Sequence, residues 1–153
     1  MSARFTEGQG NNTRDPMLLL VDGLWHCYYN AYPHRQGVDY VRTSKDLLHW
    51  SESKAVAYGG EAGASPYDAE CPHVVKVDDQ FYLFRTQQYG KENISRVYHS
   101  PDPNIFGINQ DDRYLVCSLP VAAPELVEYN GQWYIAALRE DLHGIRIARL
   151  AWK

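Results

Sequence analysis

Three segments of this 153-residue sequence repeat one another, which limits the chain to folds built from similar units. Pro16 and Pro72 are 56 residues apart, and the same offset relates Trp25 to Phe81. A third copy follows at an offset of 52 residues, from Pro72 to Pro124. A repeat of this length indicates a fold in which each copy forms one supersecondary unit.

Each copy has the pattern of short strands separated by turns. Alternating polar and apolar side chains predict strands at residues 17–21, 24–31, 38–43, 54–58, 73–77, 81–87, 95–99, 114–118, 126–129, 133–138 and 144–151. Asp22-Gly23 and Asn130-Gly131 are typical of the turns that join two strands of a hairpin. No long stretch has the spacing of an amphipathic helix.

These units predict an all-β chain of three β-propeller blades, each a four-stranded antiparallel sheet, at about residues 13–60, 66–119 and 121–153. An irregular β-sandwich is the alternative. The third blade is one strand short. The N-terminal segment, residues 1–12, is a candidate closing strand, in which Ala3 to Glu7 would pair with the third blade or with a blade of another chain.

Three blades do not close a ring, so the first and third are each expected to leave an apolar face uncovered. The chain is then either a piece of a longer protein or a unit that self-associates. Two copies would complete a six-bladed ring, and such a homodimer is expected because large exposed apolar faces are rarely tolerated.

Composition excludes several classes of partner. The net charge is −4 and no run of Lys and Arg occurs, so no nucleic acid is expected. The first 15 residues are polar, which predicts neither a signal peptide nor a membrane partner, and the location is cytoplasmic or unknown. The three cysteines are far apart and lack metal-ligand spacing, so buried, reduced thiols and no metal are expected. No glycine-rich phosphate loop is present, and no cofactor is expected.

Three acidic residues lie beside the prolines at the starts of equivalent strands: Asp15, Glu70 and Glu125. The innermost strands of a propeller line its central channel, so acids at the starts of these strands converge there. Glu125 follows its proline whereas the other two precede theirs. Because strand side chains alternate, the three acids face one cavity only if a bulge or kink lies near a proline. The alternative is that they cap backbone amides or pair with arginine.

Arg14-Asp15-Pro16 and Glu70-Cys71-Pro72 together resemble two signature motifs of the five-bladed propeller glycoside hydrolases, families 32 and 68 and more loosely 43 and 62. The segment from Ser44 to Trp50 resembles their recurring Ser-x-Asp-Leu-x-x-Trp blade segment. The resemblance implies that Asp15 stabilises the transition state and that Glu70 is the general acid/base. On the family 43 pattern Asp15 would be the base. The motif with the nucleophile lies one blade upstream in these families, and no aspartate precedes Arg14 here.

Two arginines are further candidates for the site. Arg14 is expected to fix a carboxylate or to bind sugar hydroxyl groups. Arg85, at the end of the second strand of the second unit, is expected either to reach the cavity and bind substrate or to lie on the surface. The predicted function is that of a glycosidase-like propeller acting on or binding a carbohydrate. The alternatives are an inactive carbohydrate-binding relative and a structural half-propeller.

Overall fold

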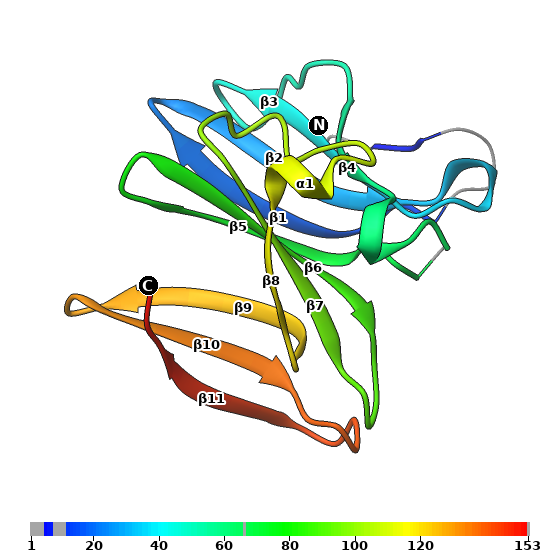
Figure 1. The fold of residues 1–153 in the computed structure, drawn as a ribbon. Helices are drawn as coiled ribbons and strands as arrows, with labels where there is room; N and C mark the ends of the chain where they lie inside the picture. Colours follow the sequence, from blue (N-terminus) through cyan, green and yellow to red (C-terminus); the bar gives the residue numbers. More distant parts are fainter. Residues whose placement is uncertain (1–4, 8–11, 66, 153) are drawn as a thin grey trace.

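The computed structural model describes residues 5–7, 12–65 and 67–152, and the strands in this part of the chain form three antiparallel sheets (Figure 1). The first sheet contains β1 (Arg14–Val21), β2 (Leu24–Ala31), β3 (Val38–Ser44) and β4 (Lys54–Tyr58). The second contains β5 (Glu70–Val77), β6 (Gln80–Gln88), β7 (Ile94–Ser100) and β8 (Leu115–Leu119). The third contains β9 (Ala122–Tyr129), β10 (Gln132–Leu138) and β11 (Ile145–Leu150). The all-β prediction is confirmed, as is a third unit with one strand fewer.

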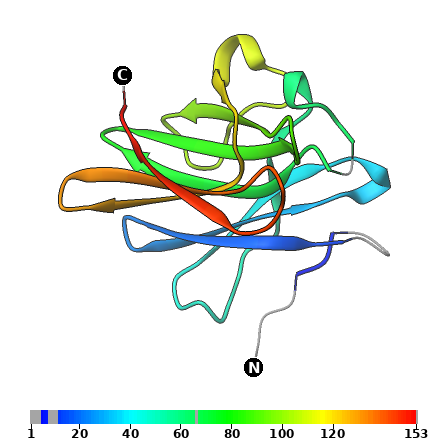
Figure 2. The same ribbon diagram turned by 90° about the horizontal axis from the view of Figure 1, so that it is seen from below.

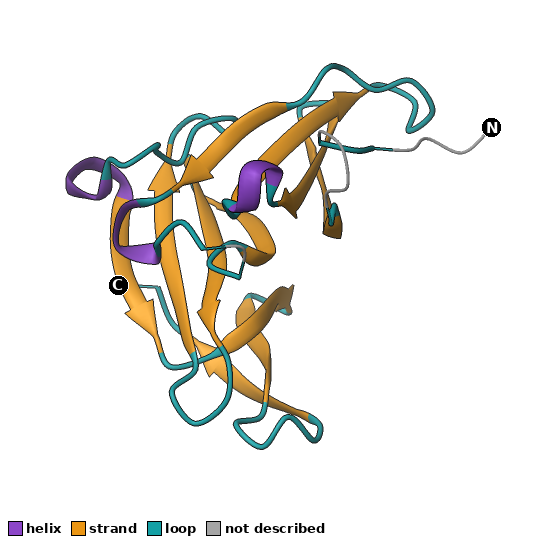
Figure 3. Cartoon of the chain, turned by 90° about the vertical axis from the view of Figure 1, so that its right-hand side faces the viewer, coloured by secondary structure: helices purple, strands orange, loops and turns teal. Residues whose placement is uncertain are grey.

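The sequence at the turns explains why neighbouring strands fold back on each other. Asp22 and Gly23 both have positive φ, 49° and 79°, as do Asn130 and Gly131, at 51° and 73°. Such a pair of residues matches the right-handed twist of the hairpin that it joins. The helical pieces η1 (Pro33–Arg35), η2 (Gly60–Ala62) and α1 (Asp111–Tyr114) are single turns in the connections (Figure 3). No helix in the described residues is long and apolar enough to cross a membrane.

The second sheet packs between the other two, with one apolar core on each of its faces (Figures 1 and 2). Successive residues of β5 point to opposite faces, so Val74 lies in the core toward the first sheet and Val75 in the core toward the third. The first core includes Tyr28, Val41, Val56, Leu83, Tyr98 and Phe106, and the second includes Phe84, Val97, Leu126 and Ile135. This stacking places β1, β5 and β9 next to one another.

The first and third sheets each expose apolar side chains on the face that points away from the second sheet. The exposed residues are Leu18 and Leu20 on β1, Val127 and Tyr129 on β9, and Ile145 and Ile147 on β11. Exposed apolar surface of this kind marks a contact region in many proteins.

The described part of the N-terminal segment, Phe5 to Glu7, lies against the first sheet and not along the edge of the third. The centroid of the Phe5 ring lies 5.5 Å from the centroid of the Tyr29 ring. Oε1 of Glu7 accepts hydrogen bonds from the Tyr29 hydroxyl at 2.6 Å and from Arg42 Nη2 at 3.1 Å. Residues 5–7 therefore contact the first sheet. Ala3 lies outside the described residues, and pairing of the N-terminal segment with the third blade or with a blade of another chain stays a prediction.

The three cysteines are free thiols in different surroundings. Cys27 is buried, Cys71 is partly buried and Cys117 is exposed. The prediction that all of them are buried is wrong for Cys117, which is exposed on β8, the edge strand of the second sheet.

Candidate active site

The first strand of each sheet carries a β-bulge beside its proline. In β1, Arg14 pairs with Asn30 and Met17 pairs with Tyr28, so two residues of β1 lie opposite one of β2. The register of β5 shifts in the same way between residues 70 and 73, and that of β9 shifts between residues 122 and 125. The extra residue interrupts the alternation of side chains and redirects them. The bulges expected near the prolines are thus present in all three strands.

The residue before each proline has a left-handed backbone although it is not glycine. The φ angle is 55° at Asp15, 51° at Cys71 and 47° at Ala123. This conformation costs on the order of 1–2 kcal/mol for a residue with a Cβ atom, so the surrounding sheet must hold it in place. The acids occupy three different places in these equivalent bulges. Asp15 directly precedes its proline, Glu70 stands two residues before its proline, and Glu125 directly follows its own.

Arg14 links the carboxylates of the two motifs. Its Nη2 donates a hydrogen bond to Oε1 of Glu70 on the neighbouring sheet, and its Nε lies 3.7 Å from Oδ2 of Asp15. The side chains of Arg14 and Glu70 are 18% and 17% exposed, so solvent screens their ion pair only weakly. The guanidinium also lies over the ring of Tyr32, 5.3 Å from its centroid. Of the two roles expected for Arg14, the structure therefore shows the contact with a carboxylate.

Asp15 and Cys71 are joined by a second contact between the two sheets. The backbone N–H of Cys71 donates to Oδ2 of Asp15 at 3.1 Å. The Cys71 thiol lies 3.4 Å from the hydroxyl of Tyr89, a residue that the sequence analysis missed. Burial raises the pKa of Cys71 to about 11 and also raises the pKa of Tyr89. Both groups are protonated at neutral pH, so Cys71 is a packed thiol and not a thiolate nucleophile.

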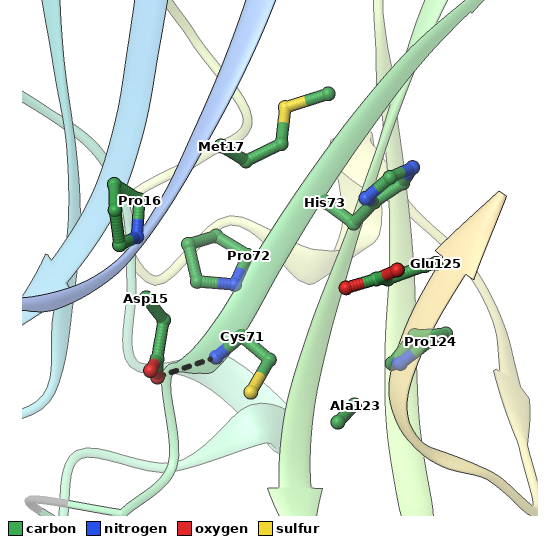
Figure 4. Close-up of a pocket in the computed structure, with 9 residues that line it drawn as sticks. All are labelled: Asp15, Pro16, Met17, Cys71, Pro72, His73, Ala123, Pro124 and Glu125. Atoms are coloured by element: carbon green, nitrogen blue, oxygen red, sulfur yellow. Dashed lines mark hydrogen bonds between the residues drawn. The ribbon is translucent and has the colours of Figure 1, made fainter. Parts of the chain in front are cut away.

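A cavity of about 290 Å³ lies between the three bulges (Figure 4). It is lined by Asp15, Pro16, Met17, Cys71, Pro72, His73, Ala123, Pro124 and Glu125. The cavity brings Asp15 and Glu125 together, whereas Glu70 and Arg14 are not among its lining residues. Its volume is close to the lower end of small-molecule pockets, about 300 Å³. Among the residues that the structure describes, no group of three His, Cys, Asp or Glu side chains is placed to hold a metal ion.

His73 lies in this cavity and connects β5 to β9. Its Nε2 accepts a hydrogen bond from the backbone N–H of Leu126 at 3.0 Å. Burial lowers the pKa of His73, although the nearby carboxylate of Glu125 acts in the opposite direction. His73 is therefore a neutral imidazole at neutral pH, held in place by the third sheet.

Arg85 is buried, so the expectation of a surface position is wrong. Its side chain is 1% exposed, and its Nε lies 3.1 Å from Oδ2 of Asp39, which is fully buried on β3. Burial raises the pKa of Asp39 to about 7, although Arg85 lowers it, and the charge of Asp15 adds to the increase. The pair lies inside the boundary between the first two sheets. Asp39 was missed, although an acid among apolar strand residues is unusual enough to be a signal.

The chain is similar in sequence to carbohydrate-active proteins. The family model described as the glycosyl hydrolases family 32 N-terminal domain matches residues 2–140. A probable sucrose-6-phosphate hydrolase from Vibrio cholerae is 35% identical over 89 residues, which are 57% of this chain and 16% of that protein. The chain thus spans only a small part of this relative.

Solved structures with the same arrangement of sheets include an α-L-arabinofuranosidase from Clostridium thermocellum, with a TM-score of 0.67 and 11% identity over 95% of this chain and 51% of that one. They also include the Bombyx mori GH32 β-fructofuranosidase BmSUC1, as a mutant in complex with sucrose, with a TM-score of 0.56 and 18% identity over 82% of this chain and 29% of that one. At such identities the likeness shows the fold alone: the three sheets correspond to propeller blades.

Proposed function

The chain belongs to the N-terminal domains of the family 32 glycosyl hydrolases, and we propose that it carries the general acid/base of a glycosidase site. One observation carries this proposal. Arg14 contacts the carboxylates of both motifs, Asp15 in its own sheet and Glu70 in the next. Two carboxyl groups held at one guanidinium, beside a cavity of about 290 Å³, support this proposal because glycoside hydrolysis uses a pair of carboxyl groups.

In the proposed reaction, the protonated form of Glu70 donates its proton to the glycosidic oxygen while the bond from that oxygen to the anomeric carbon breaks. Asp15 stabilises the positive charge that develops on the sugar ring. Water then adds its oxygen to the anomeric carbon, and the proton that it loses restores Glu70. The hydrogen bond from Arg14 fixes the position of Glu70, which directly precedes Cys71, a residue that lines the cavity.

The relatives support a furanoside as the substrate. The similar proteins include a probable sucrose-6-phosphate hydrolase, a β-fructofuranosidase in complex with sucrose and an α-L-arabinofuranosidase. We therefore propose a fructofuranoside of the sucrose type as the first substrate to test. Release of fructose from sucrose by the purified chain, and its loss in Glu70→Gln, is the expected result. Equal rates for the two proteins would refute the assignment of Glu70.

A further blade would close the ring that the three described sheets leave open. The exposed faces with Leu18 and Leu20 on one side and Ile145 and Ile147 on the other are where such a blade would pack. We propose that a second copy of the chain covers them and completes the ring. Light scattering is expected to give twice the mass of one chain, and a folded species with the mass of a single chain would contradict this proposal.

Sugar binding without hydrolysis is the second candidate function. It is favoured by one observation, that the cavity is lined by Asp15 and Glu125 whereas Glu70 is not among its lining residues. Calorimetry distinguishes the two functions. Heat of sugar binding without release of fructose from sucrose would support a binding protein, and binding accompanied by Glu70-dependent release would support the hydrolase.

A further inference from the structure

The hydrogen bond between His73 and β9 fixes which ring nitrogen of His73 carries the proton. A backbone N–H can only donate, so Nε2, which receives the N–H of Leu126 at 3.0 Å, must be unprotonated. In a neutral imidazole the proton is then on Nδ1. No described residue accepts a hydrogen bond from Nδ1, and this atom is not among the buried polar atoms without a partner. His73 therefore presents an accessible N–H donor.

Glu125 supplies the complementary acceptor. It is exposed and lines the same cavity as His73. Figure 4 shows its carboxylate beside the imidazole ring of His73, while Asp15 lies farther away, beside Cys71. No hydrogen bond or ion pair joins the Glu125 side chain to another described residue. A donor and an unpaired acceptor next to each other match the two hydrogen-bonding abilities of a sugar hydroxyl group.

The rest of the cavity fits an uncharged ligand. Its lining contains three prolines and Met17, which offer apolar surface to the C–H face of a ring, and no Lys or Arg. An anionic ligand would meet the carboxylates of Asp15 and Glu125 with no basic side chain among the lining residues to compensate.

We propose that His73 and Glu125 form a donor–acceptor pair that binds hydroxyl groups of an uncharged sugar ring in this cavity. Nδ1–H of His73 donates to one hydroxyl oxygen, and a carboxylate oxygen of Glu125 accepts from the same or the adjacent hydroxyl. The inference rests on the proposed function, in that the ligand is a carbohydrate. It assigns Glu125 to binding, separate from the proton transfer by Glu70.

The first test is the protonation state of His73, which is independent of any ligand. Nuclear magnetic resonance of the ¹⁵N-labelled chain at pH 7.5 is expected to show a neutral ring with the proton on Nδ1. The His73 signals are identified by their absence in His73→Leu or, if that variant does not fold, in His73→Gln. Addition of fructose is expected to shift the Nδ1 signal. A proton on Nε2, or no shift with saturating fructose, sucrose, arabinose or xylose, would overturn the inference.

The second test uses calorimetry with whichever of these four sugars binds. Glu125→Ala is expected to raise the dissociation constant about tenfold, the size of one lost hydrogen bond to a charged group. Glu128→Ala removes an exposed acid of the same strand outside the cavity and is expected to change it less than twofold. Equal dissociation constants for Glu125→Ala and the unaltered chain would overturn the inference.

The two proposals fail separately. Sugar binding that depends on Glu125, in a chain that does not hydrolyse sucrose, would leave the binding pair intact and refute the hydrolase. Hydrolysis that depends on Glu70, with KM unchanged in Glu125→Ala, would refute the binding pair and leave the hydrolase intact.

Discussion

Arg14 on β1 forms an ion pair with Glu70 on β5, so the two motifs that are 56 residues apart in the sequence meet at the boundary between neighbouring sheets. The two residues occupy equivalent positions of the repeat, each directly before the bulge of its strand. The repeat therefore builds the site from two equivalent strand starts.

Removal of the Arg14 guanidinium should destabilise the fold. In Arg14→Met, the partly buried carboxylate of Glu70 loses a charged partner, and the free energy of unfolding is expected to fall by about 1–3 kcal/mol. Urea unfolding measures the change. Arg139 forms an exposed pair with Asp141, and Arg139→Met should change stability by less than about 1 kcal/mol. Equal effects of the two substitutions would show that the Arg14 pair contributes no more than a surface contact.

The left-handed backbone of Ala123 should make glycine more favourable there. Ala123→Gly is expected to raise the free energy of unfolding by about 1 kcal/mol, because glycine adopts φ of 47° without steric cost. Ala136 lies in the neighbouring strand without a positive φ, and Ala136→Gly is expected to lower stability by about 0.5–1 kcal/mol. Thermal unfolding of both variants checks the prediction. A lower stability of Ala123→Gly would mean that the bulge does not strain this residue.

Asp39 should make stability depend on pH. Its pKa is raised to about 7 in the folded chain, against about 3.9 when unfolded, so the folded state binds the proton more tightly. Its contribution to stability is then fully present below about pH 4 and is lost as the pH rises to about 7. Between these values the unaltered chain is expected to lose about 2–4 kcal/mol relative to Asp39→Asn.

Urea unfolding of both proteins at several pH values measures this difference, and the comparison removes the effects of other carboxyl groups. If the difference between the two proteins stays constant from pH 4 to pH 7, Asp39 does not titrate as its burial beside Arg85 requires.

The strands and their order could be predicted because they depend on local signals. The alternation of side chains and turns such as Asp22-Gly23 placed every strand of the described part to within a few residues, and the equivalent prolines revealed the repeat. The first strand of each sheet begins earlier than predicted, because its proline lies inside the bulge and does not precede the strand.

The partners of the candidate site residues could not be predicted, because they come from distant strands. Arg85 is buried only because Asp39, 46 residues away, faces it across the sheets, and neither has a local signal that specifies the other. His73 accepts the N–H of Leu126 from the next blade in the same way. The sequence indicated which acids lie at strand starts. It did not indicate that Asp15 and Glu125 would line the cavity while Glu70 would not, nor which carboxylate Arg14 would contact.

The most direct test of the account compares the loss of kcat/KM in Glu70→Gln on two substrates. A general acid matters most when the leaving group is poor, so kcat/KM for sucrose is expected to fall about 100-fold or more, and that for an aryl fructofuranoside with an acidic phenol much less. Glu128→Gln, an exposed acid outside the cavity, should leave both values unchanged. Equal losses on the two substrates, or none, would contradict the assignment of Glu70 as the proton donor.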